Sequence, residues 1–451
     1  MAHYVQLAIW RRAACFPESL VRRNDESRTE RERAPLMDFD FPADDDPRRL
    51  AVRAWRDANP EPTQAELHAA GYVVPHWPEP WGLGADPIHQ IIIQQELAGL
   101  KVTCTKGGRE MASNAIGVGW AAPTILLGGT EEQKARYLDR IFTHEDIWCQ
   151  LFSEPDAGSD LANLATRAAR DGEEYVINGA KIWSSGAHVS DMGILIARTD
   201  PDAPKHRGIS YFAVPMDTPG LTMSPIVDMT TVHSFNQVFF ADMRLPAENR
   251  IGEEGDGWRL AKVTLANERV SLSSAGSLWG AGPSAYDLLE QIKGMGPVVD
   301  ATMRQKVARM FANAEVLRLN RLRTLSAKLN GRTPGTEASI QKLMADEHGQ
   351  EVMEFAKELV GAEGMLTGSG PSGELSQSSR SDATEIKFRK GHFPDVDPVW
   401  HYGFLFSPAL TLGGGTWAIQ RNIVAEMALG LPREPDVQQG MTWAETQKAR
   451  A

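Results

Sequence analysis

The spacing of apolar residues changes twice along this chain of 451 residues, and this change limits the fold more than any other feature. From about residue 46 to residue 142 the apolar residues recur at the interval of an amphipathic helix. From about 148 to 250 they alternate as in β-strands, and after Gly257 the helical interval returns. The pattern predicts an α+β protein with an N-terminal helical domain, a central antiparallel β-barrel-like domain and a C-terminal four-helix bundle.

We place the domain boundaries where the interval changes, which gives domains at residues 37–147, 148–250 and 251–434 and a tail at 435–451. Residues 1–36 have no apolar interval, so they have little surface to bury and are expected to be a disordered extension. The segment also lacks the apolar core of a secretory signal. A start codon assigned too far upstream of Met37 and a regulatory arm are both open interpretations.

Short motifs predict where several elements begin and turn. Asn178-Gly179 stands between two alternating runs and predicts a tight hairpin turn. Capping residues precede amphipathic runs and predict helix starts, at Asp46, Thr63, Asp86 and Thr130.

Charge and cysteine content exclude several classes of protein. The formal net charge is -12, so binding to nucleic acid through charge is not expected. No apolar run reaches the ~18 residues that a membrane-spanning helix needs. The cysteines number 3 and are scattered, which excludes a disulfide framework and a cysteine zinc site and favours the reducing cytoplasm. The histidines are dispersed as well, so no metal site is expected.

Several segments together carry a resemblance to one protein family. In chain order they are CQLFSEPDAGSDLANLATRA (149–168), INGAKIWSSGA (177–187), FFADMRLPAENRIGEEGDGW (239–258) and TLGGGTWAIQRNIVAEMALGLPRE (411–434). One segment alone would be weak evidence. All of them in this order resemble the acyl-CoA dehydrogenase family of flavoenzymes, from about residue 37 to 434. Within that family the chain is similar to an actinobacterial subgroup that degrades bulky lipids, including sterol side chains.

The resemblance implies that the protein binds FAD. A flavin ring needs flat apolar cover and hydrogen-bond donors along its polar edge. The cofactor contacts that the resemblance implies are Phe152, Ser153, Ser159, Trp183, Ser185 and Thr416. Ser159 is also implied as a contact of the CoA part of the substrate. From the residues alone, Trp183 could equally be core packing in a hairpin, and the serines could be turn residues.

Dehydrogenation of an acyl thioester needs a base, because a weakly acidic α-proton must be removed. Many family members place a glutamate directly before the Gly-Thr of the terminal helix, where this chain has Gly414. Other members place it on the first long helix of the bundle, which implies Glu268. On a helix Glu268 shares a largely apolar side with Leu260 and Thr264, and a dry pocket makes a carboxylate a better base. Without the resemblance, Glu268 beside Arg269 would be interpreted as a surface ion pair.

Two further residues receive roles from the same resemblance. The backbone N–H of Gly414 can donate to the thioester oxygen as negative charge develops there. Arg269 is implied as a substrate contact. The alternative for Gly414 is that the run Gly413 to Gly415 only lets the chain turn before the helix.

Two departures from the family pattern concern the cofactor contacts of a neighbouring subunit. The family usually has an Arg-x-x-Phe-Gly segment in the bundle, and residues 284–305 contain no such motif. The paired glycines that usually meet the adenosine half are present only in part, at 361–364. These contacts are therefore expected to be rearranged or supplied by a different chain.

The leading hypothesis is an FAD-dependent acyl-CoA dehydrogenase that forms a 2,3-enoyl-CoA and passes electrons to an electron-transfer flavoprotein. A homodimer or homotetramer is expected, or a heterotetramer with a second dehydrogenase subunit. A flavin-dependent monooxygenase of the same fold would not need Glu268. A catalytically degenerate subunit, or a DNA-associated flavoprotein of this fold, is a non-enzymatic alternative, and the negative charge argues against DNA.

Overall fold

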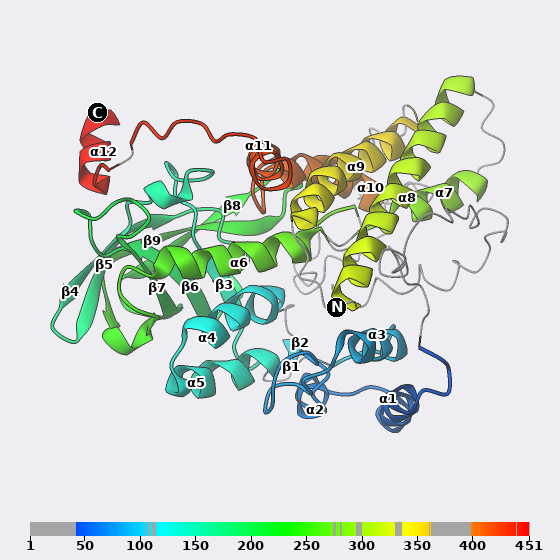
Figure 1. Cartoon of the computed structure of the whole chain (residues 1–451), viewed down its shortest axis with the longest axis horizontal. Coiled ribbons are helices and arrows are strands. Elements are labelled where there is room, and N and C mark those ends of the chain that lie inside the picture. Colours follow the sequence, from blue (N-terminus) through cyan, green and yellow to red (C-terminus); the bar gives the residue numbers. More distant parts are fainter. Residues whose placement is uncertain are drawn as a thin grey trace, which may run out of the picture.

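The computed structural model describes residues 42–103, 105–106, 109–110, 114–273, 277–279, 282–294, 300–329, 336–359, 361, 398–438 and 440–450. The extension predicted at residues 1–36 lies outside these ranges, as do residues 362–364 of the partial glycine pair. The chain forms helices, then a large sheet, then helices again, in the predicted order (Figure 1).

The N-terminal part consists of short helices that begin at the predicted capping residues. The side chains of Asp46, Thr63, Asp86 and Thr130 each accept a hydrogen bond from a backbone N–H in the first turn of the helix. The elements are α1 Pro47–Ala58, α2 Gln64–Ala69, α3 Pro87–Glu96, β1 Thr105–Lys106, β2 Arg109–Glu110, α4 Ala122–Gly128 and α5 Glu131–Phe142. These predictions of helix starts are confirmed.

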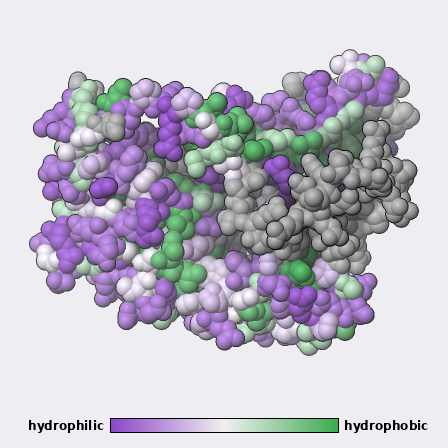
Figure 2. All heavy atoms as spheres, in the orientation of Figure 1, coloured by the Kyte–Doolittle hydropathy of each residue, from purple (hydrophilic) through white to green (hydrophobic). Residues whose placement is uncertain are grey.

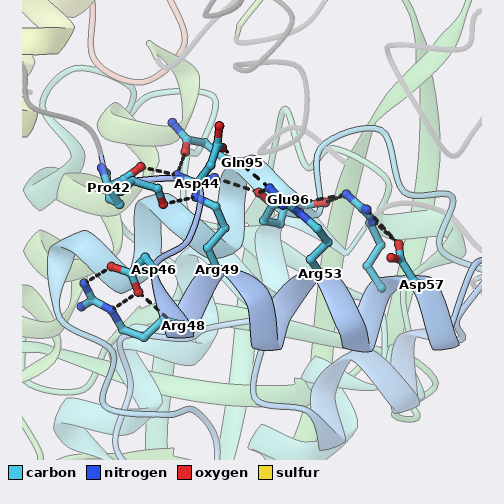
Figure 3. Close-up of polar contacts among 11 residues, drawn as sticks. Pro42, Asp44, Asp46, Arg48, Arg49, Arg53, Asp57, Gln95 and Glu96 are labelled. Carbon is cyan, nitrogen blue, oxygen red and sulfur yellow. Dashed lines mark hydrogen bonds and ion pairs between the residues drawn. The ribbon is translucent and has the colours of Figure 1, made fainter.

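A buried carboxylate ties α1 to α3. Glu96 on α3 accepts from Arg49 at 2.8 Å, from Arg53 at 2.9 Å and from Arg56 at 3.3 Å, all on α1 (Figure 3). The hydrogen bond from Arg53 is the main reason that the pKa of Glu96 lies below its ordinary value, although burial opposes it. Removing one partner of a buried ion pair costs about 3–5 kcal/mol, so this cluster fixes the two helices against each other.

The sheet is mixed and open, which differs in two respects from the predicted antiparallel barrel. Its strands are β3 Trp148–Leu151, β4 Arg167–Asp171, β5 Glu174–Lys181, β6 Met192–Arg198, β7 Ile209–Pro215, β8 Leu221–Val227, β9 His233–Pro246 and β10 Arg250–Ile251. Their order is β10-β7-β6-β4-β5-β9-β8, and β3 pairs with β6. Both β3 and β4 run parallel to β6 and follow one another along it, so the segment 152–166 leaves the sheet between them.

The predicted hairpin at Asn178-Gly179 is wrong. Strand β5 continues through both residues, and the turn lies instead at Gly172, between β4 and β5. Gly179 has a φ of 146° at a bulge, and a Cβ there would lie 2.6 Å from Oγ1 of Thr166. The glycine therefore permits a close approach of β5 to Thr166, the residue before β4. A tight hairpin turn would need glycine for a different reason, its backbone dihedral angles.

Both faces of the sheet are buried. On one face Ile194 and Ile196 of β6 share a core with side chains of α4, α5 and α6. On the other face Leu195 and Ala197 pack among residues of the neighbouring strands. Because successive residues of a strand point to opposite sides, β6 contributes to both cores, and helix α6 is held against the first.

The C-terminal part is a helical bundle built around α9. Its elements are α6 Gly257–Leu272, α7 Ala285–Gly294, α8 Ala301–Leu329, α9 Glu337–Leu359, α10 Pro398–Phe406, α11 Trp417–Ile423 and α12 Trp443–Arg450. Helix α9 contacts α6, α8, α10 and α11. Among the described helices, none combines the length and apolarity that a bilayer crossing requires.

The predicted tail contains α12, which returns to the sheet (red in Figure 1). Gln447 donates to Oδ1 of Asn163 at 2.6 Å, and the backbone N–H of Trp443 donates to the carbonyl of Ala203 at 2.9 Å. The guanidinium of the buried Arg198 lies 4.9 Å from the centre of the Trp443 ring. Helix α12 thus docks on the β-domain through polar and cation–π contacts.

Candidate active site

Glu268 lies on the buried face of α6. The buried residues of this helix include Leu260, Ala261, Thr264 and Glu268, which recur at the helical interval. Only 8% of Glu268 is exposed. A carboxylate in this position is the feature that the sequence pattern predicted.

Two other parts of the chain meet the Glu268 carboxylate. The side-chain amide of Gln150 on β3 donates to Oε2 at 3.2 Å, and the backbone N–H of Gly414 lies close enough to lower the pKa of the same carboxylate. Burial raises the pKa of Glu268 above its ordinary value, while Gln150, the charges of Lys342 and Arg269, and Gly414 offset this only in part. A desolvated carboxylate with a raised pKa can act as a general base.

Arg269 reaches toward α9 rather than toward Glu268. Its guanidinium donates to Oγ of Ser339 at 3.5 Å. Both side chains are among the described residues, and no ion pair joins Arg269 to Glu268. The surface ion pair that the bare sequence allowed therefore does not describe Glu268.

The three glycines before α11 are packed too closely for side chains. A Cβ on Gly413 would lie 2.4 Å from the Trp279 ring, and a Cβ on Gly414 would lie 2.6 Å from Cε of Lys342. Gly414 also has a φ of 69°, which favours glycine. A side chain at this position, such as the glutamate that the resemblance led us to compare, would collide with Lys342.

The segment after β3 is held by Glu154. Its carboxylate accepts from Lys181 at 2.8 Å and from the backbone N–H groups of Ala165 at 2.7 Å and Thr166 at 2.9 Å. Burial by itself would raise the pKa of Glu154, but the charge of Lys181 and these hydrogen bonds outweigh it and lower the pKa. Glu154 is therefore a structural carboxylate that shapes the loop.

The structure brings two of the predicted cofactor segments side by side. The backbone N–H of Ile182 donates to the carbonyl of Ser153 at 2.8 Å, so residues 152–153 adjoin residues 182–183. The Phe152 ring is buried against Tyr211, with 5.9 Å between ring centres, so only its backbone faces this junction.

Trp183 is exposed where the two segments meet. It is 56% exposed, has a φ of 60°, and meets Phe235 edge-on at 5.8 Å between ring centres. A tryptophan that was core packing in a hairpin would be buried, so this alternative fails. Positive φ in a bulky side chain is uncommon and tends to occur at functional sites. Ser185 is exposed two residues further on.

Ser159 and Thr416 lie outside these contacts. Ser159 is exposed in the turn before Asp160, which pairs with Lys205 at 3.2 Å. The hydroxyl of Thr416 accepts from the backbone N–H of Ile419 at 3.3 Å and so caps α11. Thr416 has a clear structural role, and its assignment to the cofactor stays a prediction.

Sequence reasoning missed two residues next to the carboxylate. Gln150 stands two positions before Phe152, and strand alternation there could have indicated that it faces α6. Lys342 is buried near the beginning of α9, and nothing local in the sequence indicates that it lies beneath Gly414.

The chain matches known proteins over most of its length. It matches the family models of the acyl-CoA dehydrogenase N-terminal domain at residues 44–145, the middle domain at 149–243 and the C-terminal domain at 255–386.

Two relatives from Mycobacterium tuberculosis are similar in sequence. Acyl-CoA dehydrogenase FadE34 is 38% identical over 83% of this chain, although the chain spans only 46% of the length of FadE34. Acyl-CoA dehydrogenase IpdE1 is 34% identical over 85% of this chain and 88% of its own length.

Two solved structures share the fold. The Tcur3481-Tcur3483 steroid ACAD has a TM-score of 0.67 and 28% identity, covering 88% of this chain and 100% of that chain. The ChsE4-ChsE5 complex from Mycobacterium tuberculosis has a TM-score of 0.66 and 28% identity, with the same coverage.

Proposed function

The chain belongs to the acyl-CoA dehydrogenase family of FAD-dependent oxidoreductases, and we propose that it dehydrogenates an acyl-CoA thioester with Glu268 as the base. The observation that carries this proposal is the buried Glu268 carboxylate, which accepts a hydrogen bond from Gln150 on β3. The reaction removes a proton from Cα and a hydride from Cβ, and leaves a 2,3-enoyl-CoA.

The residues around Trp183 fit a flavin. An exposed ring of this size offers flat cover, and the adjoining backbone of Phe152 and Ser153 with the Ser185 hydroxyl offers polar contacts. Bound FAD would supply the hydride acceptor. Ser159 and Thr416 are proposed as further contacts at the edges of the site, Ser159 toward the CoA part of the substrate.

Glu268 is the group that takes the α-proton. Gln150 holds Oε2, which orients the carboxylate, and burial raises the pKa so that the proton is accepted more strongly. The N–H of Gly414 lies at the same carboxylate and can donate to the thioester oxygen when the acyl group enters. A donor at this oxygen stabilises the developing enolate. Arg269 is proposed to bind the substrate from the α6–α9 interface.

We propose an acyl chain with a bulky or polycyclic end, because one solved relative is described as a steroid ACAD. Electrons would pass to an electron-transfer flavoprotein. We place the reaction in the cytoplasm, because a chain with only 3 cysteines suits a reducing compartment.

An oligomer is part of the proposal. Much of the surface in Figure 2 is hydrophilic, and apolar residues gather over α11 and the segment after it. The exposed apolar side chains there are Trp417, Met427, Leu429 and Leu431. An uncovered patch of this kind marks a contact surface. A homodimer, a homotetramer and a heterotetramer would all cover it, and ChsE4-ChsE5, a complex of two components, is a precedent for the last.

The test is anaerobic mixing of the flavin-loaded protein with a panel of acyl-CoA thioesters, including steroid-side-chain thioesters. Loss of the visible flavin absorption with one thioester supports the dehydrogenase. Protein that stays free of flavin when incubated with FAD favours an obligate partner or a degenerate subunit. Protein that bleaches with no thioester, but consumes oxygen with reduced flavin and a phenolic substrate, would replace this function with a monooxygenase.

A further inference from the structure

A buried ion pair on α9 has no part in the contacts described so far for substrate or flavin. Lys342 has a fully buried side chain, and its ammonium donates to Asp346 at 2.5 Å and to the carbonyl of Leu410 at 3.1 Å. Taking two charges out of water is expensive, and an ion pair repays this only with good geometry. A bundle helix needs no such pair for packing alone.

The pair lies directly beneath the glycine loop of the active site. Cε of Lys342 is 2.6 Å from the position of a Cβ on Gly414, and Cδ1 of Leu272, which lies one helical turn after Glu268 on α6, is 2.7 Å from the same position. The bond to Leu410 fastens the start of the same loop. Lys342 is therefore packed against the loop next to the helix that carries the proposed base.

We infer that Lys342 is a positioning residue for Glu268: it packs against Gly414, hydrogen-bonds to the carbonyl of Leu410, and so holds the glycine loop next to α6, with Asp346 as its buried partner. The inference rests on the proposed function only for the statement that Glu268 is the base. The position of the ion pair beneath Gly414 is independent of that role.

The other groups that face Glu268 act differently. Gln150 on β3 is a neutral donor, and Gly414 offers a backbone N–H. Arg269 is on α6 itself and contacts Ser339 with its guanidinium. Lys342 brings a full charge from a separate helix, and that charge lowers the pKa of Glu268 against the effect of burial.

Asp346 makes the effect depend on pH. Burial raises the pKa of Asp346 to about 6, although the charge of Lys342 opposes this. Above that pH Asp346 is ionised, and the Lys342–Asp346 pair is close to neutral as a whole. Below that pH Asp346 is protonated, so the positive charge of Lys342 is no longer balanced by a negative charge. Removing the lysine charge and removing the aspartate charge should therefore move the titration of Glu268 in opposite directions.

The experiment is an infrared pH titration of the full-length, flavin-loaded protein. The band of protonated Glu268 is assigned by its absence in Glu268→Gln. In Lys342→Met the midpoint of this band should shift to higher pH, and in Asp346→Asn to lower pH. Lys306→Met, which removes an exposed ion pair between α8 and α9, is the control and should leave the midpoint unchanged.

The double variant Lys342→Met with Asp346→Asn removes both charges and guards against misfolding of the single variants. Its midpoint should lie between those of the two single variants, because the favourable lysine charge and the unfavourable aspartate charge are both gone. Midpoints that stay unchanged, or that move in the same direction in both single variants, would overturn the inference. Because the band is read without turnover, a protein that dehydrogenates no thioester refutes the proposed function and leaves this test valid.

Discussion

The side-chain amide of Gln150 donates to Oε2 of Glu268 across 3.2 Å and so joins strand β3 to helix α6. Gln150 stands two residues before Phe152, in the segment proposed to meet the flavin, whereas Glu268 is proposed to meet the substrate. This one hydrogen bond therefore links the segment proposed to contact the flavin with the residue proposed to contact the substrate, and hydride passes between those two molecules. Geometry of this kind has a large effect on rate, because reacting atoms must lie within about 3–3.5 Å.

Replacing Gln150 with leucine should lower kcat about tenfold while flavin binding is retained. The carboxylate loses a donor, so it is less well oriented and harder to ionise in a buried site. Stopped-flow measurement of flavin reduction over a pH series should show the acid limb displaced upward. Gln133→Leu is the control, since Gln133 is a glutamine that donates to the carbonyls of Glu248 and Arg250, away from the site.

Glu268→Gln should reduce the rate of α-proton removal by about 10²–10⁴-fold, because the amide keeps the shape but cannot accept the proton. Glu268→Asp should keep part of the activity, since the carboxylate is only drawn back by one methylene. Both variants should bind FAD as the wild type does. Equal rates of flavin bleaching in the wild type and Glu268→Gln would show that another group is the base.

Glu268→Gln should also make the protein more stable at neutral and alkaline pH. A carboxyl group with a raised pKa stabilises the fold when it is protonated, and this stabilisation is lost as the pH rises through the raised value. The neutral amide has no such loss. Thermal unfolding should give a Tm difference in favour of the variant that grows from acidic pH to pH 8. A difference that is constant with pH would contradict the raised pKa.

Gly414→Glu should not restore the glutamate that other family members carry. The new side chain would meet Lys342 and Leu272, whose atoms lie 2.6 Å and 2.7 Å from the position of its Cβ, at a positive φ. We expect a lower Tm and a loss of activity even with Glu268 intact. Gly414→Ala, with one carbon only, should show a smaller loss of both. A fully active Gly414→Glu variant would disprove the packing argument.

Trp443→Ala should destabilise the β-domain by about 1–3 kcal/mol, because the ring covers the buried Arg198 and its loss weakens the docking of α12. The expected sign is a lower Tm with little change in the activity at low temperature. Phe311→Ala, at an exposed phenylalanine in α8, serves as the comparison for loss of an aromatic ring. If both variants unfold like the wild type, α12 contributes nothing to the stability of the sheet.

Local signals in the sequence predicted local structure well. Thr63 and Thr130 each form the predicted helix N-cap. This was predictable because the backbone N–H that each hydroxyl accepts from lies only three residues further along the chain. The burial of Glu268 followed from its position on one side of a helix. The turn assigned to Asn178-Gly179 failed, since the requirement for glycine there comes from Thr166, which directly precedes the neighbouring strand β4.

The rest of the site could not be predicted, because it depends on contacts between distant elements. Lys342 lies more than seventy positions before Gly414 in the sequence and meets it only when α9 packs beneath the loop. The same holds for the parallel pairing of β3 and β4 with β6, which an alternating pattern does not distinguish from antiparallel pairing.

The docking of α12 has a consequence for synthesis of the protein in the cell. Gln447 lies 284 positions after Asn163, its hydrogen-bond partner. At roughly 5–20 residues per second, the ribosome needs about 14–57 s to make the intervening chain. During this time the sheet can fold, but the surface around Asn163 and Arg198 stays uncovered. A nascent chain is therefore open to chaperones and proteases at this surface until helix α12 has left the ribosome.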